Sequence, residues 1–292
     1  MIRFGSTLQN YWDWRAAGNF IFGGTGSGLL ILATLMSWPG PLEPAAGLPA
    51  VVLIGLGLFL VWLEIGRPWR FLHVFFHPQT SWMTREGSVA VLLLPLALLA
   101  IVFAQGWLLA LTGVLAIAFL YCQARILQAS KGIPAWREPA VVPLIVISGL
   151  TEGTALLFLI SAVAGQPQSW TEPLLVILLA ARGYAWVRYR AALTAAEAPA
   201  EALAALGRFN PLLLGGGNVL PLVLALAATA LPTQQLPLMF SAALLALAGG
   251  WLSKFVIIRK AAHLQGYAVG RLRRGRPQIR PPVRRKPDRF VS

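Results

Sequence analysis

The stretch AVVPLIVISGLTEGTALLFLISAVA, residues 140–164, indicates which class of protein this chain belongs to. It is mostly apolar, and Glu152 is its one ionisable side chain. An α-helix of about 20 apolar residues crosses the hydrocarbon core of a bilayer. The stretch therefore predicts a transmembrane helix, and an acidic group inside it that needs a partner.

The rest of the chain has the same character. Hydrophobic residues make up 57% of it and charged residues only 12%, and the mean hydropathy is +0.69. A soluble domain with this composition would expose most of its surface as apolar atoms. The lone Cys122 excludes an internal disulfide, a cysteine-ligated iron–sulfur cluster and a thiolate zinc site in this chain.

Eight apolar runs are long enough to cross a membrane. We therefore predict an all-α integral membrane domain over residues 1–262, with eight transmembrane helices in two four-helix bundles. The predicted spans are Ala17–Ser37, Pro49–Ile65, Ser88–Ala104, Trp107–Arg125, Ala140–Ala164, Pro173–Val187, Pro211–Leu231 and Pro237–Ile258. A basic, proline-rich tail over residues 263–292 follows.

Basic residues alternate between the two sides of the predicted membrane. The loops after the first, third, fifth and seventh spans contain no Lys or Arg, whereas those after the second, fourth and sixth contain several. The positive-inside rule places basic loops in the cytoplasm, so we expect a multi-pass protein of a prokaryotic inner membrane with both termini cytoplasmic. This topology accounts for the net charge of +14 without a nucleic-acid partner.

The tail suggests a partner as well as a location. It carries nine Lys or Arg residues among four prolines from Arg271 to Ser292, a composition that does not bury a core. Anionic lipid headgroups and an acidic partner subunit are equally consistent with it.

Two ionisable residues fall in the middle of neighbouring spans. At 1.5 Å per residue, Glu152 and Arg182 lie at about the same depth in the membrane, so we predict an ion pair between them. The pair is either a structural contact that fixes helix packing or a proton relay.

Other polar residues gather where the spans reach the cytoplasmic face. Arg15 and Asn19 open the first span, Glu64 and Arg67 close the second, and Tyr121 closes the fourth. Asn218 follows three glycines in the seventh span. A headgroup with carbonyl oxygens would find hydrogen-bond donors there, although an ordinary interfacial belt explains some of these residues.

The connector LEIGRPWRFLHVFFHPQTSWMTREG, residues 63–87, is the most polar stretch between spans. His73 and His77 are spaced to share a helix face, but no third ligand is near, so no metal site is expected. The remaining histidine, His263, lies beyond the last span, so no haem ligand pair is expected. The run GGTGSG at 23–28 lies inside a span and predicts close helix packing instead of a phosphate loop.

Several of these motifs together resemble a known family. Trp12-Asp13-Trp14 before a glycine-rich first span, Gly66-Arg67-Pro68 after Glu64, and the segment 81–86 (SWMTRE) are similar to the NrfD/PsrC/DmsC family. Members of that family are membrane anchors of molybdopterin oxidoreductases.

The resemblance implies a subunit without its own redox centre that binds quinone, either ubiquinone or menaquinone, near one membrane face. It also implies two partners: an iron–sulfur electron-transfer subunit and a molybdenum or tungsten bis-molybdopterin catalytic subunit. Asn19 stands where polysulfide-reductase-like relatives carry His, and Tyr121 matches a quinone-contacting Tyr. Catalytic subunits on the cytoplasmic side would favour the sulfite- or phenylacetyl-CoA-oxidising types.

The sequence therefore predicts a quinone-binding membrane anchor that transfers electrons between an iron–sulfur subunit and the quinone pool. A polytopic transporter and a purely structural anchor remain the alternatives. The predicted quinone-binding residues are Asn19, Glu64, Arg67, Tyr121, Arg15 and Asn218. The residues predicted to dock the iron–sulfur partner are Arg70, His73, His77, Trp82, Arg85 and Glu86.

Overall fold

The computed structural model describes residues 6–65 and 68–264. In this part of the chain all regular structure is helical except for two short strands that pair with each other. The predicted tail lies outside the described residues apart from His263 and Leu264, which form one of these strands.

The long helices form eight rods, three of which contain a π-helical segment. In chain order the rods are α1 (Trp14–Gly18) continued by η1 (Asn19–Gly23) and α2 (Gly24–Ser37); α3 (Pro44–Glu64); α4 (Trp82–Val102); α5 (Gly106–Gln128); α7 (Val141–Val163); α8 (Thr171–Ala195); α9 (Ala200–Asn210) continued by η3 (Pro211–Val219) and α10 (Leu220–Ala230); and α11 (Gln235–Phe255) continued by η5 (Val256–Lys260). The shorter elements are β1 (Thr7–Leu8), η2 (Pro68–Phe76), α6 (Pro134–Arg137), η4 (Pro232–Gln234) and β2 (His263–Leu264).

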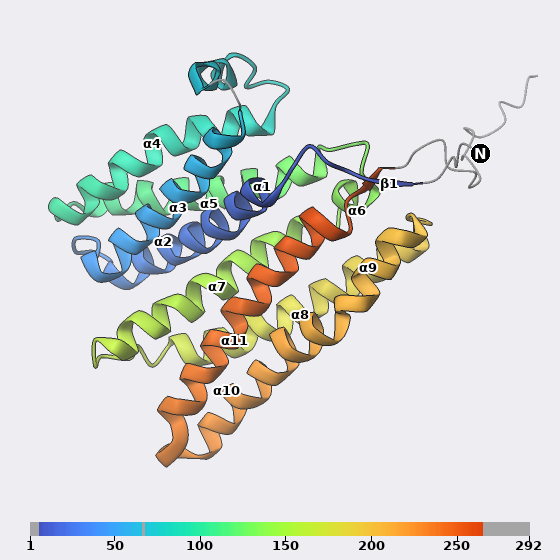
Figure 1. Ribbon diagram of the computed structural model, residues 1–292. Helices are drawn as coiled ribbons and strands as arrows, with labels where there is room; N and C mark the ends of the chain where they lie inside the picture. The colour runs from blue at the N-terminus through green and yellow to red at the C-terminus, as the bar shows by residue number, and fades with distance from the viewer. Residues whose placement is uncertain (1–5, 66–67, 265–292) are drawn as a thin grey trace, which may run out of the picture.

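The rods lie in two groups of four (Figure 1). The first group contains the α1–η1–α2 rod with α3, α4 and α5, and the second contains α7, α8, the α9–η3–α10 rod and α11. Helices α2 and α7 pack against each other along their length and join the groups.

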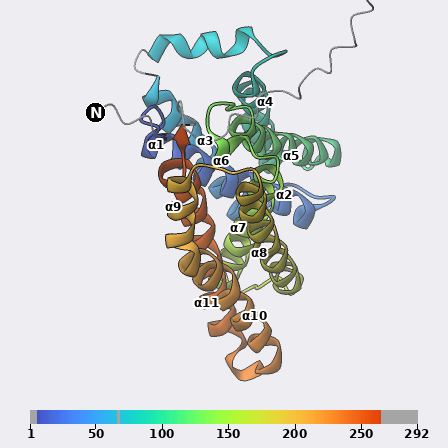
Figure 2. The same ribbon diagram turned by 90° about the vertical axis from the view of Figure 1, so that its right-hand side faces the viewer.

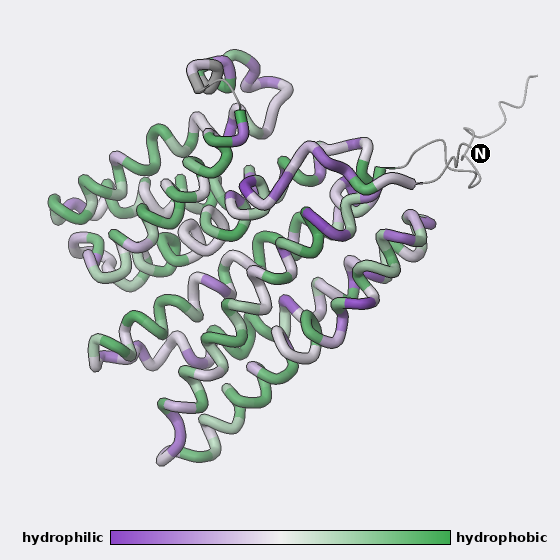
Figure 3. The backbone as a smooth tube through the Cα atoms, viewed as in Figure 1, coloured by the Kyte–Doolittle hydropathy of each residue, from purple (hydrophilic) through white to green (hydrophobic). Residues whose placement is uncertain are grey.

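Among the described residues, seven helical rods are long and apolar enough to cross a membrane. Most of their length is hydrophobic (Figure 3), and the chain is a multi-pass membrane protein. The remaining rod, α8, has 25 residues but carries Glu172, Arg182, Arg188 and Arg190. Its crossing of the membrane, and so the count of eight spans, stays a prediction.

Glycines let α2 and α7 approach closely. A Cβ atom on Gly28 would collide with the backbone of Gly149, and one on Gly153 would collide with the backbone of Gly28 and Leu29. Small residues permit such backbone contact between membrane helices. The glycine-rich run at 23–28 therefore serves helix packing, as the sequence predicted.

Helix α4 begins earlier than predicted. The sequence favoured a start near Ser88, but the helix starts at Trp82, where the Ser81 side chain accepts a hydrogen bond from the Thr84 backbone N–H at 3.2 Å. A serine that caps the free N–H groups in this way stabilises a helix start. The segment 82–87 is consequently helical, and its side chains point into and out of the bundle.

The two ends of the helical domain meet at one end of the rods. β1 pairs antiparallel with β2, and Gln9 donates from its backbone to Ala262 and from its side chain to Trp12 and Ile258 carbonyls. We call this end, where Arg15, Arg85, Arg125, Arg137 and Arg259 lie, the basic end. The segment η2 packs against α3 and α4 and is the uppermost helix in Figure 2.

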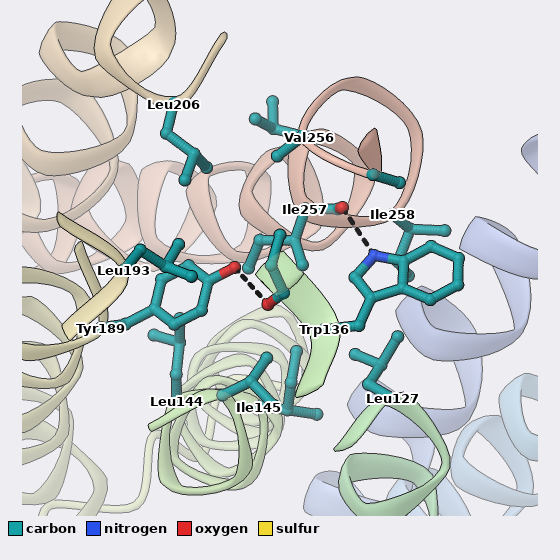
Figure 4. Close-up of a cluster of buried hydrophobic side chains, with 14 of the residues drawn as sticks. Leu127, Trp136, Leu144, Ile145, Tyr189, Leu193, Leu206, Val256, Ile257 and Ile258 are labelled. Atoms are coloured by element: carbon teal, nitrogen blue, oxygen red, sulfur yellow. Dashed lines mark hydrogen bonds between the residues drawn. The ribbon is translucent and has the colours of Figure 1, made fainter. Parts of the chain in front are cut away.

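An apolar cluster under the basic end joins elements of both groups (Figure 4). Trp136 of α6 stacks on Trp12 with ring centroids 4.7 Å apart and donates from its indole to the Ile257 carbonyl at 2.9 Å. Tyr189 of α8 donates to the Ala135 carbonyl at 2.7 Å. These two hydrogen bonds satisfy the polar tips of large side chains that are otherwise buried among aliphatic residues.

Candidate functional site

A buried polar cluster lies at the centre of the first helix group. Asn19 of η1, Glu86 of α4 and Gln123 of α5 are 3%, 4% and 0% exposed. The Asn19 Nδ2 atom lies 3.5 Å from Glu86 Oε1, and Gln123 Nε2 donates to the Asn19 carbonyl at 3.1 Å. We call these three residues the central cluster.

The position of Glu86 corrects a prediction. The sequence assigned it to a surface that docks a partner, but its carboxyl group faces the interior of the bundle. The early start of α4 is the reason, because it places Glu86 in the second turn of the helix, on the face that packs against α5 and meets Asn19 of η1. The Asn19 prediction is also refined: its Oδ1 atom packs against Gly57 of α3, so its side chain is enclosed by protein.

Arg15 and Glu64 lie at a second place, where α1 meets the end of α3. The Arg15 guanidinium forms an ion pair with Asp13 at 2.8 Å and donates to the Leu63 carbonyl at 2.8 Å. Hydrogen bonds from Arg15 lower the pKa of the Asp13 carboxyl. Glu64 is half-buried beside them, and its Oε1 atom is buried with no hydrogen-bond partner among the described residues. We call this place the Glu64 edge.

An exposed aromatic surface adjoins the Glu64 edge. The rings of Phe59 and Trp62 stack with centroids 5.8 Å apart and are 49% and 37% exposed. Leu63 next to them is 41% exposed. A membrane helix presents such a face to lipid, and an apolar chain could also lie against it.

Tyr121 lies at a third place, on the outer surface between α4 and α5. Its hydroxyl accepts a hydrogen bond from Arg125 at 2.7 Å. The guanidinium carbons of Arg85 and Arg125 lie 4.2 and 4.4 Å from the centroid of the Trp82 ring, so both cations stack on one indole. Trp82 and Arg85 are thus together near the surface, as a docking role would require.

The connector between α3 and α4 holds the other predicted docking residues. His73 and His77 are exposed, and the His73 ring makes an edge contact with Phe76. Arg70 belongs to η2. Arg67, predicted to contact quinone, lies outside the described residues.

The two predicted members of the intramembrane ion pair do not pair with each other. Glu152 Oε2 lies 2.7 Å from Nζ of Lys254 on α11, and both side chains are fully buried. The same oxygen accepts a hydrogen bond from Thr25 at 2.6 Å, and Trp251 donates to Thr25 at 2.9 Å. The predicted partner was wrong because α11 lies against α7 at this level and brings the Lys254 ammonium to the carboxylate.

Arg182 has other partners. Its guanidinium donates to Asn218 Oδ1 and to the Ala246 carbonyl, both at 2.8 Å, and to the Gly217 carbonyl. The Asn218 amide in turn donates to the Leu213 carbonyl. Asn218 therefore holds Arg182 within the second helix group and lies apart from the other predicted quinone residues.

Two functional candidates are not among the predicted site residues. Lys254 is an ionisable residue within the eighth predicted span, and such a residue needs a partner as much as Glu152 does. Gln123 is a buried amide on the predicted fourth span, two residues after Tyr121. The signal for both was a polar residue inside an apolar run, and the missing information was which helices are neighbours.

Comparison with known proteins bears on the first helix group. Residues 4–112 match the family model described as polysulphide reductase, NrfD. No curated protein matches the chain. The matched residues include β1, the first three rods and the start of α5, and so contain Asn19, Glu64 and Glu86. The resemblance to the NrfD family that the sequence motifs carry is therefore confirmed over residues 4–112.

Proposed function

We propose that this chain is the quinone-reactive membrane subunit of an oxidoreductase complex. The observation that carries the proposal is the Glu64 edge: a buried carboxyl oxygen of Glu64 that has no hydrogen-bond partner among the described residues, in the segment that matches the NrfD family.

The residues at this edge fit a quinone. A quinone headgroup carries two carbonyl oxygens, which accept hydrogen bonds, and a protonated carboxyl group donates one. The exposed face of Phe59, Trp62 and Leu63 offers an apolar surface for an isoprenoid tail. When bound, quinone supplies the two-electron chemistry, and the side chains of this chain hold the headgroup and exchange protons with it.

Roles follow for the surrounding residues. Glu64 holds or releases a proton at its free carboxyl oxygen. Arg15 fixes the edge by joining Asp13 of the N-terminal lead to the Leu63 carbonyl. Asn19 and Glu86 line the interior behind the edge. In this proposal Tyr121 contacts a partner subunit or a lipid at the surface, and Asn218 takes no part in quinone binding.

The partners are an iron–sulfur subunit and a molybdenum or tungsten catalytic subunit, and the membrane is a prokaryotic inner membrane. We propose that the iron–sulfur subunit docks on the connector with His73 and His77, and on the stacked cations around Trp82. The rods continue through their π-helical turns and through Pro95 of α4, which favours an anchor over a transporter built on broken helices.

The test is turnover of the purified complex with the catalytic subunit's substrate and a soluble quinone analogue. Glu64→Gln is expected to lower quinone-dependent turnover about ten-fold or more, while reduction of a dye that accepts electrons from the soluble subunits stays unchanged. Glu43→Gln, at the other end of α3, is the matched control. Equal quinone turnover in Glu64→Gln and the control would refute the assigned site.

A further inference from the structure

Buried polar groups of the two helix groups meet over the backbone of Gly23 and Gly24. A Cβ atom on Gly23 would collide with Nε2 of Gln123. A Cβ atom on Gly24 would collide with Nζ of Lys254 and would lie 3.6 Å from Oε1 of Gln123. The Gln123 amide and the Lys254 ammonium therefore flank the same glycine, one from each helix group.

Three acceptor atoms along this line have no partner among the described residues. They are Oδ1 of Asn19, Oε1 of Gln123 and Oε1 of Glu152, and the three side chains are 3%, 0% and 0% exposed. A buried acceptor without a donor is destabilising, and buried water commonly satisfies such groups. Lys254 has three N–H donors and needs only one for Glu152, so a water between it and Gln123 Oε1 would have suitable partners.

The line of polar groups is inclined to the rods. Glu86 lies four residues into α4, about 6 Å from its start, whereas Glu152 lies eleven residues into α7, about 17 Å from its start. Both helix starts belong to the basic end of the rods. The line thus runs from just below the basic end to the middle of the second helix group.

Each step of the line is short. Glu86 contacts Asn19, Asn19 accepts from Gln123, Gln123 and Lys254 flank Gly24, and Lys254 pairs with Glu152. Beyond Glu152, its unpaired Oε1 faces Gly250 of α11, one turn from the Ala246 carbonyl that Arg182 binds. The basic groups Lys254 and Arg182 therefore lie on either side of the Glu152 carboxylate.

We propose that Glu86, Gln123, Lys254 and Glu152 enclose internal water and form a proton path between the central cluster and the Glu152–Lys254 pair. The proton passes between the carboxyl groups, the water and the Lys254 amine, and each transfer breaks one O–H or N–H bond as it forms the next. The Gln123 amide holds the water in place and carries no proton itself, and the next proton restores each carrier. The proposal rests on the proposed function for its purpose. Reduction of one quinone consumes two electrons and two protons, and the Glu152–Lys254 pair holds protons that the path exchanges with the central cluster.

The first test is a density map of the wild-type complex at a resolution that shows ordered water. Water is expected within hydrogen-bond distance of Gln123 Oε1 and of Lys254 Nζ, and also beside Glu152 Oε1. A map in which protein atoms fill these positions would overturn the path. This measurement needs neither a variant nor quinone turnover.

The second test is quinone-dependent turnover of the complex in H2O and in D2O. Gln123→Leu, which interrupts the line, is expected to lower kcat about ten-fold, to raise the solvent isotope effect and to leave KM for quinone unchanged. Gln123→Glu should restore much of the rate, and Ser161→Ala, a buried hydroxyl off the line on α7, should behave as wild type. An unaltered isotope effect and rate in Gln123→Leu would exclude the path while leaving the quinone site standing; absence of quinone turnover in the wild type would instead refute the proposed function.

Discussion

Glu152 of α7 and Lys254 of α11 form a fully buried ion pair, with 2.7 Å between Oε2 and Nζ. Without its partner, either charge would be buried among lipid or apolar side chains. The ion pair therefore fixes the register of α7 against α11.

Removing one member should be worse than removing both. Glu152→Gln or Lys254→Met alone leaves a buried charge without its partner, which costs about 3–5 kcal/mol. The double variant should recover part of that loss. Thermal unfolding of the purified chain, followed in the same detergent for all four proteins, measures the coupling, and additive losses would show that the two side chains are independent.

The glycine contact between α2 and α7 should be intolerant of a methyl group. Gly153→Ala would push its Cβ into the backbone of Gly28 and Leu29, and neither backbone can move without separating the two helix groups. We expect a loss of folded protein that Gly55→Ala, where a Cβ meets no atom within 4 Å, does not cause. Yields of monodisperse protein by size-exclusion chromatography compare the two variants.

Arg182 should resist conservative replacement. Its guanidinium reaches three acceptors in different directions, and an ammonium group on a single stem does not reproduce that fork. Arg182→Lys is expected to lower stability by about 1–3 kcal/mol, with Arg188→Lys on the same helix as the exposed control. Equal melting temperatures for the two variants would contradict this account.

The orientation in the membrane can be tested with single cysteines in a Cys122→Ala background. Gln79→Cys and Ser130→Cys lie in connectors at the basic end, and Gln166→Cys lies in the connector between α7 and α8. The positive-inside rule predicts that a membrane-impermeant thiol reagent added to intact cells labels only the Gln166 position. The reverse pattern would place the basic end outside the cytoplasm.

Much of the fold could be predicted from the sequence because lipid exposure leaves a strong signal. Each apolar run of about 20 residues has to be a helix, since no water satisfies an open backbone within a bilayer. The hydropathy pattern places the start of α4 too late because the segment 82–87 is polar, and polar residues beside a span are typical of a loop. The Ser81 cap shows that the helix begins before its apolar part.

The site was harder to predict than the fold because polar contacts depend on which helices are neighbours. Glu152 indicates a buried charge in the sequence. Whether its partner is Arg182 or Lys254 depends on the packing of α11 against α7, which the sequence does not show. The sequence likewise shows Glu86 as an acidic residue next to Arg85. Its side chain points into the bundle because α4 starts at Trp82, and the hydropathy pattern does not reveal that start.

The pairing of β1 with β2 also has a consequence for biogenesis. A ribosome releases Thr7 and Leu8 first and their partners His263 and Leu264 only after all the long helices. The hydrogen bonds of Gln9 and Trp12 to Ile258 and Arg259 can therefore form only after η5 has been synthesised. The closing of this pair marks the completed insertion of the chain, and a chain stalled before its last helix would leave its own N-terminal lead without its native partners.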